Sequence, residues 1–328
     1  MVKGLLVIAL AASIAACGDV PQTIMDPAGD NARTALDLFV PILWLSLAIF
    51  IGVEGFIVYS MVRFRYRKGN DAIPVQTHGN TKLELLWTAI PTVIVLGLAV
   101  MTFRTIAVQA AEPAPDAVQV EVVGNQWWWE FYYPDLGITT ANELYLPVGR
   151  DAAFTLKSND VIHSFWFPRI SGKMDLVPGR TNKMRFRPEK TGEYDGQCTE
   201  FCGFAHAEMQ MRLFVVEQEG FDAWVARQKA SPRPSTQIAT RGGELVRDRG
   251  CAACHAIAGT DVQGQIGPEL TAFGLRTTIG AGLVENTDEN LAAWIRNPEA
   301  VKPGVKMPAL GLNDEEIAAV VSYLKELK

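Results

Sequence analysis

Positive charge, cysteine and histidine are all scarce in this sequence. The 30 lysines and arginines are outnumbered by 36 acidic residues, and the net charge of −6 argues against a nucleic-acid-binding protein, which usually has a basic surface. Only five cysteines and four histidines are present, and all except Cys17, His78 and the upstream His163 lie within two short motifs. Ligand-type residues that are so few and so closely grouped indicate metal chemistry.

The chain begins with an apolar leader. Lys3 precedes an apolar run that is too short to span a bilayer, which is typical of a signal peptide over residues 1–17. The sequence IAAC at residues 14–17 resembles a lipobox, in which the leader is cut before a cysteine that carries lipid. Ordinary cleavage nearby, with Cys17 unmodified, is the alternative.

Two longer apolar stretches follow, at about residues 36–62 and 85–103. Each is long enough to cross a hydrocarbon core of about 30 Å as a helix. The segment between them contains RFRYRK at residues 63–68, so the positive-inside rule predicts a cytoplasmic loop. Both ends of the hairpin then face outward, and everything after residue 104 is predicted to be extracytoplasmic.

From about residue 116 to 228 the sequence shows the alternation of half-buried strands. Strands are predicted over residues 118–122, 153–156 and 209–216, separated by turn signals such as Pro178-Gly179. This pattern predicts an all-β sandwich or Greek-key barrel.

One loop of this region concentrates soft metal ligands. The sequence QCTEFCGFAHAEM supplies two thiolates (Cys198 and Cys202), an imidazole (His206) and a thioether (Met209), and His163 lies upstream at a predicted strand end. These ligand types favour copper, and a His/Cys/Met set on a β-sandwich is the cupredoxin pattern. A blue-copper site needs one cysteine, whereas two cysteines can bridge two coppers with one histidine on each. Such a pair moves electrons but has no open position for a substrate.

Alternatives remain for these ligands. Cys198 and Cys202 could form a disulfide, because the predicted compartment is oxidising. A C-x3-C motif also fits a copper chaperone of thioredoxin-like fold, but that fold needs alternating strands and helices and leaves the histidines without a role. Met211 is a rival to Met209, although its place further along the strand favours packing.

The set resembles the binuclear copper domain of subunit II of haem-copper cytochrome c oxidases. The resemblance is carried by His163, the loop 198–209, the run Gln126-Trp127-Trp128-Trp129 and the sequence KMDLVPGR at residues 173–180, and it extends over about residues 30–220. It implies a copper A centre with six ligands: His163, Cys198, the backbone carbonyl of Glu200, Cys202, His206 and Met209.

The same resemblance implies three further properties. The Glu200 side chain helps to hold a magnesium ion at the interface with subunit I. Trp127 is the exposed ring through which electrons reach copper. Quinol-oxidising relatives lack the copper ligands, so a cytochrome c-type electron source is expected here.

The rest of the chain indicates a linker and a helical domain. Residues 229–240 contain two prolines and small polar residues without an apolar period, which predicts a mobile linker. Helices are predicted over residues 243–249, 288–297 and 313–324, the last with an N-cap and a capping-box-like glutamate. We therefore expect a tethered domain, held near the copper domain at high effective concentration.

A covalent haem signal opens this domain. Cys251-Ala252-Ala253-Cys254-His255 is the C-x-x-C-H motif, in which the cysteines form thioethers to haem and the histidine binds iron. A redox-active C-x-x-C is the alternative, but it requires a thioredoxin-like context. Met307 is the only methionine beyond the motif, where no other histidine occurs, and His/Met ligation suits electron carriage. A lysine ligand or an open site is the alternative. The sequence GPEL at residues 267–270 resembles the loop beneath the proximal histidine of class I cytochromes c.

These observations predict a multidomain fold: a two-helix transmembrane hairpin, an all-β cupredoxin-like Greek-key barrel and an all-α class I cytochrome c domain. The predicted boundaries are a lipoprotein-type signal peptide over residues 1–17, a periplasmic tether and the hairpin over 18–110, the copper domain over 111–228, the linker over 229–240 and the cytochrome c domain over 241–328.

The resemblance implies the electron-input subunit of a proton-pumping cytochrome c oxidase. Electrons would pass from haem c to the copper pair and on to subunit I, where oxygen is reduced to water; this sequence has no spare histidines to build that oxygen site. The implied partners are subunits I and III, and the implied donor is cytochrome c or an upstream respiratory complex. The implied location is the bacterial inner membrane, with the copper and haem domains on the periplasmic side.

Two hypotheses stay open at this point. Glu84, at the start of the second apolar stretch, is a candidate for the mouth of a proton path, and a solvated carboxylate at a helix start is the alternative. A membrane-bound electron-transfer module that serves another reductase or delivers copper is the rival class of protein. The two-helix hairpin favours the oxidase, because soluble carriers do not need it.

Overall fold

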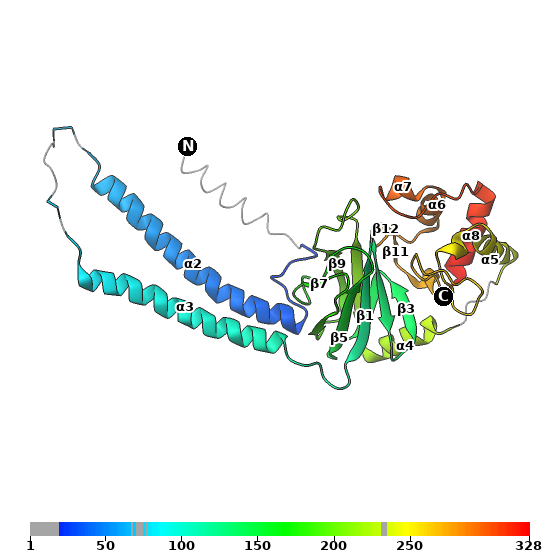
Figure 1. The fold of residues 1–328 in the computed structure, drawn as a ribbon, viewed down its shortest axis with the longest axis horizontal. Helices are drawn as coiled ribbons and strands as arrows, with labels where there is room; N and C mark the ends of the chain where they lie inside the picture. Colours follow the sequence, from blue (N-terminus) through cyan, green and yellow to red (C-terminus); the bar gives the residue numbers. More distant parts are fainter. Residues whose placement is uncertain (1–19, 67, 70–74, 77, 231–234) are drawn as a thin grey trace. The chain divides into compact units, whose positions relative to one another are not determined.

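The computed structural model describes residues 20–66, 68, 69, 75, 76, 78–230 and 235–328. The leader and Cys17 lie outside these residues, so the signal peptide and its lipid stay predictions. The described chain forms two compact units, one of residues 33–111 and one that combines residues 20–32 with residues 112–328 (Figure 1).

Two long helices make up the smaller unit, α2 (Asp30–Arg63) and α3 (Thr81–Gln109). Their lengths of 34 and 29 residues correspond to about 51 and 44 Å at 1.5 Å per residue, more than a hydrocarbon core of about 30 Å. Both are long and apolar enough to cross a membrane. Their surfaces are apolar, with Trp44 and Phe56 each about two-thirds exposed, which suits lipid rather than water.

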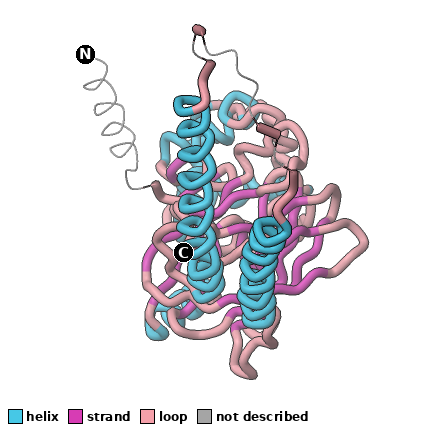
Figure 2. The backbone as a smooth tube through the Cα atoms, turned by 90° about the vertical axis from the view of Figure 1, so that its left-hand side faces the viewer, coloured by secondary structure: helices cyan, strands magenta, loops and turns pink. Residues whose placement is uncertain are grey.

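A β-sandwich of two five-stranded sheets forms the centre of the larger unit, and Figure 2 shows its strands gathered together in magenta. The first sheet has the order β3 (Ile138–Ala141), β2 (Trp128–Tyr133), β1 (Val118–Asn125), β5 (Ala152–Ser158) and β8 (Asn182–Phe186). The second has the order β4 (Glu143–Pro147), β10 (Gln210–Val216), β9 (Gly192–Cys198), β6 (His163–Trp166) and β7 (Met174–Leu176).

The topology is that of a cupredoxin-like barrel. β1 pairs with β5 and β4 with β10 in parallel, whereas the other neighbours are antiparallel. Alternate side chains point inward, so large apolar residues fill the space between the sheets. Trp129, Phe131, Phe154 and Phe165 are all at most 1% exposed. The predicted all-β class of this domain is confirmed.

Helix α4 (Gln218–Gln228) packs against β4 and β10 of the second sheet. Its Trp224 side chain is buried and stacks on Tyr145 with ring centroids 4.9 Å apart. This apolar contact fixes the end of the β domain before the chain continues into the next one.

The C-terminal domain is mainly helical. Its elements are α5 (Gln237–Asp248), the 3₁₀ turns η1 (Cys251–Ala253) and η2 (Phe273–Leu275), the short strands β11 (Thr278–Ile279) and β12 (Val284–Glu285), and the helices α6 (Asp288–Arg296), α7 (Pro298–Val301) and α8 (Asp314–Glu326). The β11–β12 hairpin adds a small sheet to a domain that was predicted to be all-α.

Local capping explains where these helices begin. Asn313 and Glu316 form the expected capping box of α8, each side chain bonding the other's backbone N–H. α5 begins at Gln237 because the Thr236 hydroxyl accepts a bond from Ala239 N at 3.1 Å. Residues 237–240 are therefore helical, although they were predicted to belong to the linker.

The cytochrome domain makes direct contacts with the β-sandwich, which differs from the expected mobile tether. Gln210 N donates to Ala281 O at 3.0 Å, so the start of β10 bonds the turn between β11 and β12. Two buried charged residues, Glu143 from β4 and Lys302 from the segment after α7, also join the two domains. A linker that looks mobile in sequence therefore connects domains that pack on each other.

Candidate copper and haem sites

The copper site is built on a hairpin loop of the second sheet. β9 and β10 are antiparallel with Gln197 opposite Gln210. The loop between them closes where Cys198 N donates to Met209 O at 3.0 Å. His163 starts the neighbouring strand β6, and Phe165 on that strand pairs with Cys198. The sheet therefore brings ligands far apart in sequence to one end of the sandwich.

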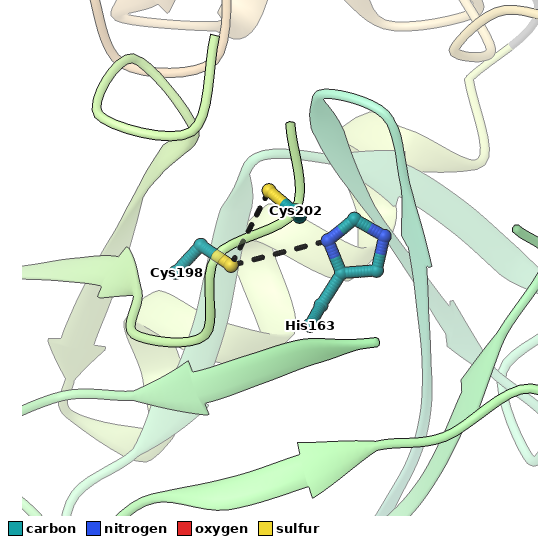
Figure 3. Close-up of side chains that lie close together, drawn as sticks. All are labelled: His163, Cys198 and Cys202. Atoms are coloured by element: carbon teal, nitrogen blue, oxygen red, sulfur yellow. Dashed lines mark hydrogen bonds between the residues drawn. The ribbon is translucent and has the colours of Figure 1, made fainter. Parts of the chain in front are cut away.

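Five candidate ligand atoms converge there. The Sγ atoms of Cys198 and Cys202 lie 3.8 Å apart, and Nδ1 of His163 lies 3.9 Å from Cys198 Sγ (Figure 3). On the other side of the pair, His206 Nδ1 lies 3.5 Å and Met209 Sδ 3.8 Å from Cys202 Sγ. Two sulfur ligands at about 2.3 Å from one ion in a tetrahedral arrangement are about 3.8 Å apart. The separations therefore fit a shared metal centre.

Burial supports the same interpretation. Among the described residues, His163, Cys198 and Cys202 form a buried ligand cluster, and Met209 is fully buried. Soft ligands in an apolar, water-excluding pocket suit copper better than a hard cation. The set thus has the donors and the surroundings for a binuclear copper centre.

The electrostatics favour a metal-binding thiolate. The hydrogen bond shared with Cys202 lowers the pKa of Cys198 to about 4 against the opposing effect of burial, and His163 acts in the same downward direction. The pKa of Cys202 is raised, first by the same shared bond and then by burial. One proton is therefore shared by two sulfurs, and a cation would replace it.

His163 is held from two sides. Its Nε2 lies 2.8 Å from Asp160 Oδ1, so the carboxylate fixes the tautomer that leaves Nδ1 free toward Cys198. Burial alone raises the pKa of Asp160, but hydrogen bonds from His163, Val161 and Gln126 together lower it. On the other side, a Cβ at Gly124 would lie 2.7 Å from His163 Cδ2, so only glycine leaves room for the ring.

The alternatives for the thioether and the carbonyl can be compared on the structure. Met211 is also buried, but it packs in the core two residues along β10, whereas Met209 Sδ faces Cys202. The carbonyl oxygen of Glu200 lies 3.3 Å from Cys198 Sγ, while the Glu200 side chain is exposed. Both cysteines are free thiols, and the β-sandwich does not have the thioredoxin-like fold.

Trp127 touches the copper loop directly. Its indole Nε1 donates to the carbonyl of Cys202 at 3.1 Å, and Gln126 Nε2 donates to the same oxygen at 2.7 Å. The ring was expected to be exposed, but it is half-buried, and Lys306 Nζ of the cytochrome domain lies 5.9 Å from its centre. A hydrogen-bonded route therefore joins this ring to a candidate copper ligand.

The haem motif lies on a compact loop. Cys251 and Cys254 are half-buried free thiols on the η1 turn, and His255 Nδ1 lies 2.7 Å from Pro268 O, to which it donates. This bond engages Nδ1, so Nε2 is the ring nitrogen left for an iron ligand. Burial lowers the pKa of His255, which keeps the imidazole neutral for metal binding.

The surroundings of His255 also fit a large apolar group. A Cβ at Gly267 would lie 2.7 Å from His255 Cε1, so the loop 264–268 packs tightly against the ring. The preceding residue, Ile266, donates its backbone N–H to Cys254 O, yet its side chain is 73% exposed. An exposed isoleucine beside the attachment cysteines offers the apolar contact that a haem needs.

Two predicted site residues lie elsewhere. Met307 is half-buried on the loop between α7 and α8, directly after Lys306, and its pairing with His255 stays a prediction. Glu84 lies exposed in the first turn of α3, where Asn80 caps the helix. Its role in a proton path also stays a prediction.

A β-sandwich that gathers two thiols, two imidazoles and a thioether defines a cupredoxin-like copper domain, here joined to a c-type cytochrome domain. Three family models match the chain in order: "Cytochrome C oxidase subunit II, transmembrane domain" over residues 20–105, "Cytochrome C oxidase subunit II, periplasmic domain" over 137–217 and "Cytochrome c" over 239–328.

Curated relatives match over nearly the whole length. The cytochrome c oxidase subunit 2 of Alkalihalophilus pseudofirmus is 38% identical, covering 95% of this chain and 92% of the relative. Those of Bacillus sp. (strain PS3) and Bacillus subtilis are 36% and 34% identical, covering 97% and 96% of this chain and 95% and 94% of the relatives. The chain therefore belongs to the cytochrome c oxidase subunit II family.

Several residues that shape the sites were missed in the sequence. Asp160 stands three residues before His163, a spacing that could have suggested a carboxylate partner. Gly124, Glu143 and Lys302 carry no local signal, because each acts on a residue far away in the chain.

Proposed function

We propose that this chain is the electron-input subunit of a respiratory cytochrome c oxidase, an oxidoreductase. The observation that carries the proposal is the convergence of three sulfur and two imidazole ligand atoms at Cys198 and Cys202. The same chain also holds a C-x-x-C-H motif whose histidine is oriented by Pro268. Two electron-carrying sites and two membrane-length helices in one chain suit a subunit that feeds a membrane partner.

The proposed copper ligands are the six inferred above: His163, Cys198, the Glu200 carbonyl, Cys202, His206 and Met209. Copper held there supplies one-electron chemistry with little change in bond length. The chain contributes a buried ligand set on a β-sheet frame, in which Asp160 fixes the His163 ring and apolar walls exclude water. Little reorganisation is needed, because the polypeptide already holds the ligands together.

For the haem, we propose thioethers from Cys251 and Cys254 and axial ligation by His255 and Met307. A haem held there supplies a second one-electron site, and a methionine ligand raises its potential. The bond from His255 to Pro268 O fixes the ring and strengthens the imidazole as a ligand. The short segment from Lys302 to Met307 then connects the methionine side of the site to the copper domain.

The electron route runs from haem c through the Trp127 region to copper and on to the oxygen-reducing site in subunit I. The indole bond to the Cys202 carbonyl supports Trp127 as the point where electrons reach the copper domain. Oxygen reduction and proton pumping are proposed to take place in subunit I, with subunit III as a further partner. Cytochrome c or an upstream respiratory complex would be the donor.

Three finer proposals accompany this route. The exposed Glu200 carboxylate is available to hold magnesium with subunit I. Glu84 is proposed as the mouth of a proton path. The chain is proposed to lie in the bacterial inner membrane, with its copper and haem domains on the periplasmic side.

The test uses the assembled complex and a full-length Cys251→Ser/Cys254→Ser variant. The wild-type complex should contain a haem-bearing partner subunit and show a near-infrared mixed-valence copper band. The variant should lack covalent haem, keep that band, and take up oxygen slowly with its native donor. Unchanged oxygen uptake would remove the haem domain from the main electron route, and a strong blue-copper spectrum would contradict the binuclear centre.

A further inference from the structure

We infer that Lys302 and Glu143 are positioning residues that lock the cytochrome domain in one orientation on the copper domain, with the Met307 loop against Trp127. The inference deepens the proposed function and rests on it for the direction of electron flow. In this arrangement the haem domain is a docked donor, and not a tethered one that must diffuse to its acceptor.

Lys302 is a charged residue with almost no access to solvent. Its side chain is 2% exposed, and its ammonium donates to Trp127 O at 2.8 Å, Glu208 O at 2.8 Å and Gly280 O at 2.9 Å. Three donors thus meet three carbonyl oxygens, two of them from the copper domain. A buried ammonium is stable only when all its hydrogen bonds are made, so separating the domains would leave it to be rehydrated.

Glu143 repeats this arrangement in the opposite direction and with the opposite charge. It comes from the copper domain, is 2% exposed, and its Oε1 accepts bonds from the cytochrome domain. The donors are Thr277 N at 2.7 Å, Thr277 Oγ1 at 2.8 Å, Thr278 N at 3.0 Å and Thr278 Oγ1 at 3.3 Å. Each domain therefore inserts one charged side chain into a polar socket of the other.

The charged side chains of Lys302 and Glu143 lie at a contact where the surfaces of the two domains also match closely in shape. A Cβ at Gly282 would lie 3.0 Å from Gln210 Cβ, beside the backbone bond from Gln210 N to Ala281 O. A Cβ at Gly304 would lie 2.6 Å from the Phe204 ring, so glycine is needed where this loop meets the copper loop. A transient encounter would not require such close backbone contact.

The locked segment is the one that carries the proposed haem ligand. Lys302 begins the loop that contains Met307, and Lys306 Nζ donates to Gln126 Oε1 at 3.0 Å while lying over the Trp127 ring. Trp127 in turn bonds the Cys202 carbonyl. The loop is thereby fixed against the residue through which electrons are proposed to reach copper.

The test compares full-length variants in the purified oxidase. Lys302→Met removes the three bonds at similar side-chain length, and Glu143→Gln changes charge at nearly constant shape. The matched controls are Lys325→Met, a half-buried lysine that bonds Asn286 O within the cytochrome domain, and Glu121→Gln, which pairs with Lys157 within the copper domain.

Hydrogen exchange reports the docking without using electron transfer. In the wild-type oxidase we expect the amides of Gln210, Thr277 and Thr278 to be protected. Lys302→Met and Glu143→Gln should each speed their exchange by about tenfold, while peptides from α8 stay unchanged. Free exchange in the wild type, or Lys302→Met behaving as Lys325→Met does, would overturn the inference. If the oxidase with Lys302→Met does not assemble, the amide exchange rates of the Glu143→Gln variant decide whether the docking contact exists.

Electron transfer from haem to copper, started by a light flash, is the second readout. The wild-type rate should be independent of salt, because buried ions are little screened, whereas a mobile charged domain would slow as salt rises. Each positioning variant should lower the rate by about tenfold with both cofactors retained. Protected amides without electron transfer to copper would uphold the docking and reject the proposed route. A salt-sensitive rate together with unprotected amides would reject the docking alone.

Discussion

The copper and haem sites of this chain both bring together the ligands of an electron-carrying group, but they do so in different ways. The proposed haem attachment residues come from five consecutive positions, Cys251 to His255, on and directly after one turn. The proposed copper ligands come from the start of β6, the end of β9 and the loop that follows it. The first site depends mainly on local sequence, and the second depends on the whole sheet. Changes in the β-sandwich should therefore reach copper binding much more readily than changes in the helical domain reach haem attachment.

The largest effect should come from Cys198→Ser. Serine is a harder and less polarisable ligand than a thiolate, so it cannot bridge a copper pair. We expect the near-infrared band to be lost and the copper content to fall by about half or more, while the covalent haem spectrum stays normal. Metal analysis and optical spectra of the purified complex measure both. An intact copper band would show that Cys198 does not bridge a copper pair, and the contrast between the two sites would then fail.

Asp160→Asn tests the support behind a ligand rather than the ligand itself. The carboxylate fixes the His163 tautomer, so its loss should weaken copper binding by about 10- to 100-fold. Competition with a copper chelator gives the affinity. Asp195→Asn is the control, because Asp195 lies on the same sheet but faces Arg212. If both variants weaken copper binding equally, the loss of affinity comes from removing a negative charge and not from the bond to His163.

Gly124→Ala tests how tightly the sheet holds the site. The new Cβ would meet the His163 ring at 2.7 Å, which should lower the free energy of unfolding of the copper domain by about 1–3 kcal/mol. Gly172→Ala is the control, since no atom lies within 4 Å of its Cβ position. Denaturation followed by the copper signal separates them, and similar midpoints would mean that the ring moves aside freely.

The smallest effect belongs to the helical domain. Asn313→Ala removes the cap of α8 and half of its capping box, which should destabilise the cytochrome domain by about 1 kcal/mol. Copper affinity should not change, because no copper ligand lies on that helix. Thermal unfolding followed at the haem band and at the copper band gives the two midpoints, and a parallel fall in both would indicate that the domains unfold as one.

The same contrast explains how much could be predicted from sequence. The C-x-x-C-H motif and the loop from Cys198 to Met209 are contiguous, so their chemistry could be inferred before any fold was known. The β class, the two apolar helices and the capping box of α8 follow from periodicity and local signals. His163 was recognised chiefly through family resemblance.

What was missed depends on tertiary contacts. Glu143 alternates with Leu144 and Leu146 and looks like a solvent-facing strand residue, yet it is buried by a segment more than a hundred positions away. Lys302 follows a proline-started helical turn and resembles a surface lysine. Composition also suggested a mobile linker and a domain free to move. Linker composition could not predict the docking, because it says nothing about whether the domains it joins have matching surfaces.

The 3.8 Å separation of Cys198 and Cys202 has a consequence for how the protein is made. A disulfide bond is about 2.05 Å long, so a small movement of this pair would close it, and the lowered pKa of Cys198 provides the reactive thiolate. The proposed compartment is oxidising. In that compartment a newly exported chain would face a competition between metal loading and oxidation, and the proposed haem cysteines Cys251 and Cys254 would face the same competition before haem attachment. For the proposed location, we therefore expect biogenesis of this subunit to need thiol-reducing capacity outside the cytoplasm, in a compartment that otherwise promotes disulfides.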